Sequence, residues 1–239
     1  MGKIITLYGP DGSGKTTLAY ALADRLAGPD HLVLIVHTDF TRPVLQEHTP
    51  NKQDALSLGQ LLMTGDMDSL DRATVPYKEN NAVFIVGIQG GETYASYPDY
   101  PPEAARAFLR AASAAFDAVI LDTTDNVHDG LALAGLDQCS HVAYLIPPNI
   151  QGIVFANAYA GLLESFHAKE KSVYIAAKVR PFSNLHLVEH TLGIRYAVQL
   201  PLSPEADYLN LSGAPIRHCH KKDGIRYEQA VELIQQQIG

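Results

Sequence analysis

The 239-residue sequence has few of the features that mark secreted, membrane-spanning or disulfide-stabilised proteins. It contains no tryptophan and only two cysteines, Cys139 and Cys219, which lie far apart and outside any Cys-x-x-Cys pattern. No apolar run approaches the roughly 20 residues that a membrane-spanning helix needs. The first apolar run begins almost at the N-terminus, which leaves no room for a signal peptide. These absences predict a cytoplasmic protein with free thiols and no integral membrane segment.

Positive charge is also scarce. The 18 Lys and Arg residues are outnumbered by 26 Asp and Glu residues, so the formal net charge is −8. This balance makes nucleic acid an unlikely partner, because nucleic-acid-binding surfaces depend on clustered cations. With 46% hydrophobic and 18% charged residues, the chain is typical of a globular protein. Its length predicts one domain over residues 1–239.

The most specific motif spans residues 9–16, Gly-Pro-Asp-Gly-Ser-Gly-Lys-Thr, which matches the phosphate-loop pattern G-x-x-x-x-G-K-[ST]. An apolar run at 4–8 precedes it like a buried strand, and residues 17–23 follow it like a helix. That order aims backbone N–H groups and a helix dipole at a polyphosphate, whereas a chance match would be only a glycine-rich turn. We therefore predict a bound nucleoside triphosphate, with Lys15 on its β- and γ-phosphates and Thr16 on Mg²⁺. The predicted nucleotide-binding residues are Gly9, Pro10, Asp11, Gly12, Ser13, Gly14, Lys15, Thr16 and Thr17.

Apolar runs alternate with helical patterns along the chain, as in βαβ units. The run at 118–121 is continuously apolar, which is typical of a strand covered on both faces. The alternation predicts an α/β fold with a doubly wound, mostly parallel sheet and helices on both faces. We interpret 64–82 and 89–101, which follow neither pattern, as loops or lids. The predicted strands are 3–8, 31–36, 83–87, 118–121, 141–146, 172–177 and 195–199. The predicted helices are 15–27, 53–63, 102–115, 150–166, 185–192 and 226–237.

Two acidic residues follow predicted strands. Asp39 lies just past the strand at 31–36, and Asp122 ends the strand at 118–121. Because ligands of open α/β sheets bind at the carboxyl ends of the strands, both carboxylates should border the pocket. Three apolar residues followed by Asp122 form the Walker B pattern, whose carboxylate holds Mg²⁺. The alternative is that each Asp only caps a strand end or a turn. For the nearby Asp125 and Asp129, we favour such a turn role.

The order of these segments resembles that of the MinD/ParA family of ATPases, and within it the pilus-assembly ATPases called CpaE or TadZ. The likeness rests on the phosphate loop, on Val-Leu-Ile-Val-His-Thr-Asp at 33–39, on Val-Ile-Leu-Asp-Thr-Thr-Asp at 119–125 and on Tyr-Leu-Ile-Pro-Pro-Asn at 144–149. It implies ATP as the nucleotide, together with Mg²⁺. It also implies that Asp39 positions the attacking water and that His37 replaces another family Asp. Lys15 and Asp39 are thus the candidate catalytic residues, and Thr16 and Asp122 the candidate metal ligands.

The sequence departs from the family at its most distinctive position. The family's loop carries an early lysine that reaches the partner's nucleotide across a dimer, and here that position is Pro10, followed by Asp11 in place of glycine. Neither side chain supplies a cation to phosphoryl transfer, which predicts slow hydrolysis and a homodimer only weakly coupled to nucleotide. Arg42 is a candidate replacement cation. We expect either a slow ATPase switch that positions an unidentified protein partner, or an ATP-dependent scaffold that never hydrolyses.

Two further interpretations are weaker. The loop at 9–17 is also similar to that of thymidylate kinases, but a nucleotide kinase needs an arginine-bearing lid, and no arginine occurs between Asp122 and Lys178. The run His-Cys-His at 218–220 resembles a metal cluster, but no second Cys or His group lies at zinc spacing. We therefore favour neither a kinase nor a zinc site.

Overall fold

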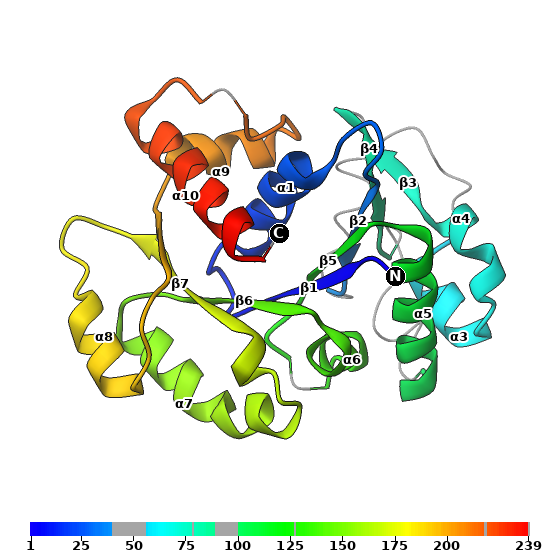
Figure 1. Ribbon diagram of the computed structural model, residues 1–239, viewed down its shortest axis with the longest axis horizontal. Coiled ribbons are helices and arrows are strands. Elements are labelled where there is room, and N and C mark those ends of the chain that lie inside the picture. Colours follow the sequence, from blue (N-terminus) through cyan, green and yellow to red (C-terminus); the bar gives the residue numbers. More distant parts are fainter. Residues whose placement is uncertain (40–55, 78, 89–99, 127, 218, 239) are drawn as a thin grey trace.

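The computed structural model describes the chain except for residues 40–55, 78, 89–99, 127, 218 and 239 (Figure 1). Within the described residues, one sheet of eight strands runs in the order β3-β4-β2-β5-β1-β6-β7-β8. Neighbouring strands are parallel except for β3 and β4, which are antiparallel. The predicted mostly parallel α/β architecture is therefore confirmed. The strands are β1 (Lys3–Tyr8), β2 (Val33–His37), β3 (Val75–Tyr77), β4 (Asn80–Val86), β5 (Ala118–Asp122), β6 (His141–Ile146), β7 (Ser172–Val179) and β8 (Val198–Pro201).

Helices cover both faces of the sheet, and the central strands are buried on both sides (Figure 1). In β1, Ile5 and Leu7 belong to one apolar cluster, whereas Ile4 and Tyr8 belong to a second cluster on the opposite face. This alternation follows from the two-residue period of a strand. The first cluster lies under α1 (Lys15–Leu26), α9 (Pro204–Leu211) and α10 (Lys222–Ile238). The second lies under α3 (Leu58–Thr64), α5 (Pro102–Ala115), α6 (Gly130–Gln138), α7 (Ile150–Ser165) and α8 (Leu185–Leu192).

The prediction that 64–82 is a loop is wrong. This stretch holds the short helices η1 (Met67–Ser69) and α4 (Leu70–Ala73), all of β3 and the start of β4. β3 is a three-residue strand at the edge of the sheet, and Pro76 is exposed. Proline is tolerated there because an edge strand has one side without a partner strand, so its missing N–H costs no hydrogen bond. So short a strand, with a proline at its centre, lacks the alternation on which the prediction relied. Most of the other expected loop, 89–101, lies outside the described residues.

Two longer helices, α6 and α9, were also missed. Helix α6 contains Gly130 and Gly135, which weaken a helical pattern. A Cβ on Gly135 would lie 2.9 Å from a methyl group of Leu121, so close packing against β5 requires the glycine. Helix α9 does have a readable start, because the Ser203 hydroxyl accepts a hydrogen bond from the Ala206 amide and proline opens the first turn.

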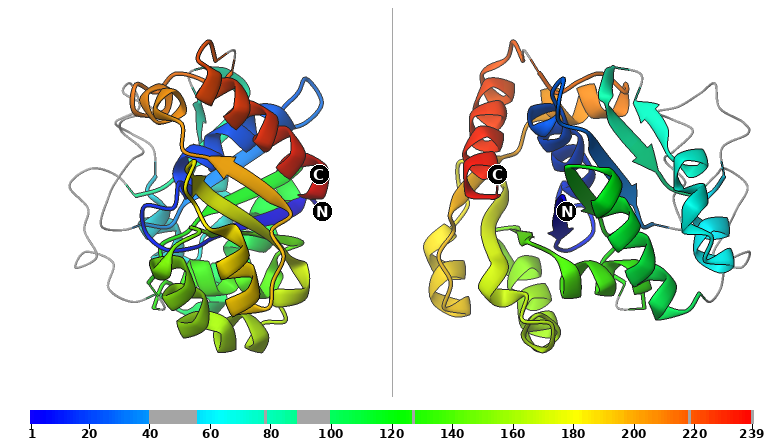
Figure 2. Two further views of the ribbon diagram at one scale, coloured as in Figure 1. Left: turned by 90° about the vertical axis from the view of Figure 1, so that its left-hand side faces the viewer. Right: turned by 45° about the vertical axis from the view of Figure 1, so that its right-hand side comes forward.

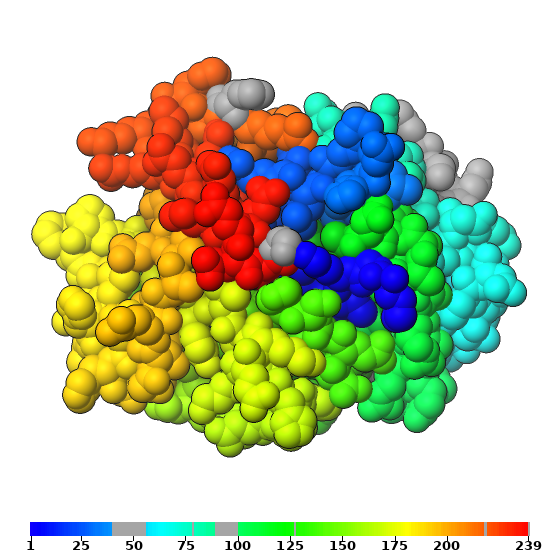
Figure 3. All heavy atoms as spheres, in the orientation of Figure 1, coloured from blue at the N-terminus to red at the C-terminus, as the bar shows by residue number. Residues whose placement is uncertain are grey.

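The two ends of the chain meet on one side of the sheet. Figure 3 shows the end of α10 beside the first residues of the chain, and Figure 2 shows α10 lying along α1. The Arg25 guanidinium of α1 donates to the backbone carbonyl of Glu228, at 3.1 Å. Among the described residues, no helix is both long and apolar enough to cross a membrane.

Asp129 holds residues that directly follow β2 and β5. Its buried carboxylate accepts hydrogen bonds from the hydroxyls of Thr38 and Thr124, and from the amides of Leu131 and Ala132 at the start of α6. Burial raises the pKa of Asp129, although the hydrogen bonds act in the opposite direction. The residue therefore caps a helix, as its expected turn role implies, and also ties Thr38 and Thr124 at the sheet edge to that helix.

We expect Asp129→Ala to lower the free energy of unfolding by about 2–3 kcal/mol, because a helix cap and two buried hydroxyl contacts are lost together. Asp137→Ala, at the other end of α6, is the matched control. Its ion pair with Arg106 is partly exposed, so its loss should cost less than about 0.5 kcal/mol. Urea unfolding of both variants measures the difference, and equal costs would contradict the assigned role.

Candidate functional site

The loop between β1 and α1 is shaped by three glycines with positive φ. Gly9, Gly12 and Gly14 have φ values of 151°, 70° and 94°. These angles suit glycine and strain residues that carry a Cβ. At Gly9 there is also no space, because a Cβ there would lie 2.3 Å from the backbone carbonyl oxygen of Leu145. The loop therefore curves back over the start of α1, with Gly14 as the residue that precedes the helix.

Lys15 lies inside this curve. Its buried ammonium donates to the carbonyl oxygens of Gly9, at 2.8 Å, and Pro10, at 3.1 Å. Burial lowers the pKa of Lys15, and the charges of four carboxylates oppose that shift. These carboxylates belong to Asp122, Asp125, Asp11 and Asp39. The loop thus holds one buried cation close to an excess of negative charge.

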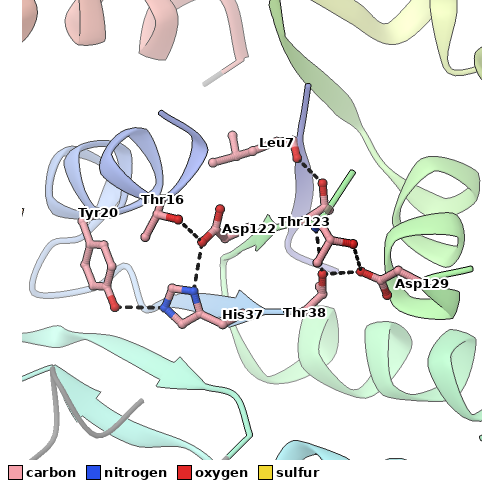
Figure 4. Close-up of polar contacts among 9 residues, drawn as sticks. Leu7, Thr16, Tyr20, His37, Thr38, Asp122, Thr123 and Asp129 are labelled. Atoms are coloured by element: carbon pink, nitrogen blue, oxygen red, sulfur yellow. Dashed lines mark hydrogen bonds and ion pairs between the residues drawn. The ribbon is translucent and has the colours of Figure 1, made fainter. Parts of the chain in front are cut away.

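Thr16 and Asp122 bring two oxygen groups together. Figure 4 shows the Thr16 hydroxyl donating to Oδ2 of Asp122, at 2.7 Å. Thr16 lies in the first turn of α1, and Asp122 is the last residue of β5, next to β1 in the sheet. Hydroxyl and carboxylate oxygens are ligands that Mg²⁺ prefers. These two residues therefore fit a metal ion at the mouth of the loop.

His37 was not assigned a role from the sequence, but it contacts Asp122 directly. Parallel register places His37 opposite Asp122, and its Nδ1 donates to Oδ2 of that carboxylate at 3.0 Å. The Nε2 atom hydrogen-bonds the hydroxyl of Tyr20 at 2.9 Å. All three side chains are buried. A histidine that ends a buried strand next to the predicted acidic strand was the available signal.

Of the other acidic and basic residues considered from the sequence, Asp39 and Asp125 are described by the structure and Arg42 is not. Asp39 follows β2 and lies near enough to Lys15 for its charge to act on that pKa. Arg42, the candidate replacement cation, lies outside the described residues. Asp125 was expected to serve its own turn, but its Oδ2 accepts a hydrogen bond from the backbone amide of Asp11, at 3.1 Å. Its carboxylate is therefore a neighbour of the phosphate loop.

Lys178 is a second cation at the loop that sequence reasoning did not assign. It has a φ of 51°, unusual for a residue with a side chain, at the point where the pairing of β7 with β8 becomes irregular. Its Cε lies 3.5 Å from the place that a Cβ on Gly14 would occupy. Within the described part of the chain, its ammonium makes no hydrogen bond or ion pair. A motif search does not find such a residue, because the approach of Lys178 to Gly14 depends on a local irregularity of the backbone.

The run at 218–220 gives no support to a metal site. His218 lies outside the described residues, and Cys219 is buried with its backbone amide hydrogen-bonded to the Glu228 carboxylate. Across the residues that the structure describes, no group of three His, Cys, Asp or Glu side chains is arranged to hold a metal ion.

Known structures match the chain over more of its length than known sequences do. No family model matches the chain. Signal recognition particle proteins of Mycobacterium bovis and Mycobacterium tuberculosis are 36% identical over 121 residues, which is 50% of this chain but only 18% of their own length. The chain therefore spans about a fifth of the curated relatives that it matches.

Solved structures match over nearly the whole chain. MinD from Pyrococcus horikoshii, in complex with Mg-ADP, has a TM-score of 0.75 and 16% identity, covering 98% of this chain and 96% of that one. A ParA family ATPase from Chlorobium tepidum has a TM-score of 0.79 and 15% identity, covering 98% and 99%. The MinC:MinD complex of Aquifex aeolicus has a TM-score of 0.77 and 15% identity, covering 98% and 95%. The chain has the fold of the MinD and ParA ATPases.

The loop geometry predicts different costs for two glycine substitutions. Gly12→Ala meets no atom within 4 Å, so we expect only left-handed backbone strain, about 1–2 kcal/mol of unfolding free energy. Gly9→Ala adds a collision with the Leu145 carbonyl, and should cost more than about 3 kcal/mol. Urea unfolding of the two variants without nucleotide tests this order. Equal costs would show that the loop does not approach β6 as described.

Proposed function

We propose that residues 1–239 form one nucleotide-binding domain that binds Mg·ATP, recruits or positions a protein partner in the cytoplasm, and hydrolyses ATP slowly. The observation that carries this proposal is the glycine-shaped loop around buried Lys15, next to the contact between Thr16 and Asp122. The fold of MinD and ParA ATPases, found over nearly the whole chain, supports it.

Each residue has a role in this proposal. The loop amides of residues 9–17 and the Lys15 ammonium bind the phosphates at the positive end of the α1 dipole. Thr16 and Asp122 hold Mg²⁺, which neutralises phosphate charge when it is bound. Asp39, which follows β2 at the same sheet edge and whose charge acts on Lys15, orients the attacking water. ATP is preferred to GTP because the resemblance is to ATPases.

The charge around the loop supports slow turnover. Four carboxylates act on Lys15, and the loop itself contributes Asp11 where the MinD/ParA pattern has glycine. Pro10 provides no cation where that pattern has lysine. Lys178 adds positive charge from within the same chain, next to Gly14. We assign it to binding the nucleotide and not to accelerating phosphoryl transfer, because it adjoins the residue preceding α1. Within the MinD/ParA fold, we place the chain in the CpaE/TadZ branch on the resemblance of its sequence pattern.

The partner is a protein in this proposal. One structural neighbour is a complex of MinD with MinC, which gives a precedent for the fold. The competing hypothesis is a scaffold that binds ATP without hydrolysing it, and it is favoured by Pro10 and Asp11.

Lys15→Ala should abolish measurable ATP binding, because it removes the only cation held inside the described loop. Isothermal titration calorimetry with Mg·ATP measures this, with circular dichroism as the check of folding. Unchanged affinity in the folded variant would contradict the assignment of the loop.

Phosphate release then separates a slow ATPase from a scaffold. Asp39→Ala should keep ATP affinity and lose phosphate release, because the water is no longer oriented, while wild type releases phosphate above the level of Lys15→Ala. If wild type binds ATP but releases no more phosphate than Lys15→Ala, the scaffold hypothesis is the correct one.

Dimerisation should depend on the two departures in the loop. We expect wild type to show little ATP-dependent dimerisation, because Pro10 cannot bridge to a second nucleotide. Pro10→Lys combined with Asp11→Gly should strengthen that dependence, and sedimentation velocity with and without Mg·ATP measures it. A tight wild-type dimer that forms only with ATP would contradict this explanation and indicate another bridging residue.

A further inference from the structure

We infer that His37, held by Tyr20, is a positioning residue that orients the Asp122 carboxylate toward Mg²⁺. The inference rests on the proposed function of the site, since it concerns how the metal ligand is held. It goes further by assigning a role to two buried side chains that no phosphate-loop motif contains.

The first step is the direction of the hydrogen bonds at Asp122. A carboxylate only accepts hydrogen bonds, so His37 Nδ1 must carry the hydrogen in its 3.0 Å contact with Oδ2. The Thr16 hydroxyl approaches the same oxygen at 2.7 Å. In the described part of the chain, no hydrogen bond is made to Oδ1. The two donors therefore fix Oδ2 and leave Oδ1, which has no donor among the described residues, available to help hold Mg²⁺.

The second step is the orientation of the imidazole. His37 Nε2 contacts the Tyr20 hydroxyl at 2.9 Å, and the two rings lie 5.7 Å apart between centroids (Figure 4). Tyr20 also packs against Tyr77, at 5.4 Å between ring centroids. Tyr20 and His37 are 3% and 4% exposed, so water does not readily replace either contact. The hydroxyl thus holds the ring in the plane in which Nδ1 reaches Asp122.

The third step is where the three residues come from. Tyr20 lies on α1, one turn beyond Thr16, while His37 and Asp122 end neighbouring parallel strands. The series of hydrogen bonds from Thr16 through Asp122 and His37 to Tyr20 consequently begins and ends on the helix that follows the phosphate loop. The position of the metal-binding carboxylate is therefore tied to the same helix that binds the phosphates. Side chains that orient a metal ligand typically contribute 10–100-fold to metal affinity.

The test is the Mg²⁺ concentration that gives half of the full enhancement of ATP binding. A fluorescent ATP derivative is titrated into the full chain across a MgCl₂ series and, separately, in EDTA. His37→Leu removes the donor to Asp122 and should raise this Mg²⁺ midpoint roughly tenfold or more, while affinity in EDTA changes little. Tyr20→Phe removes one oxygen atom, and should raise the midpoint by a smaller factor of roughly three.

Two variants distinguish positioning from a structural role. His37→Asn carries an amide N–H near the place of Nδ1–H, and should restore most of the wild-type midpoint. Tyr144→Phe is the matched control, since the Tyr144 hydroxyl is buried without a hydrogen-bond partner among the described residues, and should leave the midpoint unchanged. A structural role would lower the melting temperature of the His37 and Tyr20 variants without moving the Mg²⁺ midpoint.

The outcomes are separable. If wild type responds to Mg²⁺, and Tyr20→Phe and His37→Leu have the same Mg²⁺ midpoint as wild type, the positioning role alone is overturned. If His37→Leu does not fold, Tyr20→Phe decides, and an unchanged midpoint overturns the inference. Wild type that binds no ATP, or binds it equally with and without Mg²⁺, overturns the proposed function of the site and this inference with it.

Discussion

The parallel register of β1, β5 and β2 is the constraint on which the site depends. It aligns Leu7 with Asp122 and His37 with Asp122 at the carboxyl edge of the sheet. Because the loop and α1 follow directly from β1, Thr16 comes back to the same edge and meets the carboxylate. A shift of one residue in β5 would turn Asp122 to the other face of the sheet and separate all these contacts. The apolar packing on both faces of β1 and β5 prevents that shift, so the core determines the geometry of the polar site.

Electrostatics at this edge differ from those of a simple anion-binding loop. A helix N-terminus and a lysine favour phosphate, but Asp11 and Asp125 bring carboxylates to the loop amides. Phosphate charge close to these carboxylates is unfavourable unless cations accompany it. In the proposed function, this arrangement favours nucleotide that arrives with its metal over free nucleotide. Lys178, whose Cε lies 3.5 Å from the place that a Cβ on Gly14 would occupy, adds positive charge to this region.

The features that could be predicted from the sequence are those that depend on residues close to one another along the chain. The loop at 9–16 and the strands of the mostly parallel sheet are local patterns, and Asp122 followed from its place at a strand end. His37, Tyr20 and Lys178 could not be assigned in this way. Their contacts depend on register between strands that are far apart in sequence, or on a left-handed backbone at one residue. Helix α6 was missed for a related reason, because Gly135 is set by packing against β5 and not by helical propensity. The roles of Lys15, Thr16, Asp39 and Asp122 in binding and catalysis stay predictions.

The hydrogen bonds of Asp129 have a consequence for how Asp39 can move. Thr38, the residue before Asp39, is held on both sides, by the Asp129 carboxylate through its hydroxyl and by the Asp122 carbonyl through its amide. The backbone that leads into Asp39 is therefore anchored, at Thr38, to the start of α6 and to β5. Because the residue before Asp39 is fixed, adjustment of the Asp39 carboxylate relative to the loop depends on rotation about the bonds of Asp39 itself. The Asp39 carboxylate can then move only as far from its Cα as the short side chain allows, about 2–3 Å.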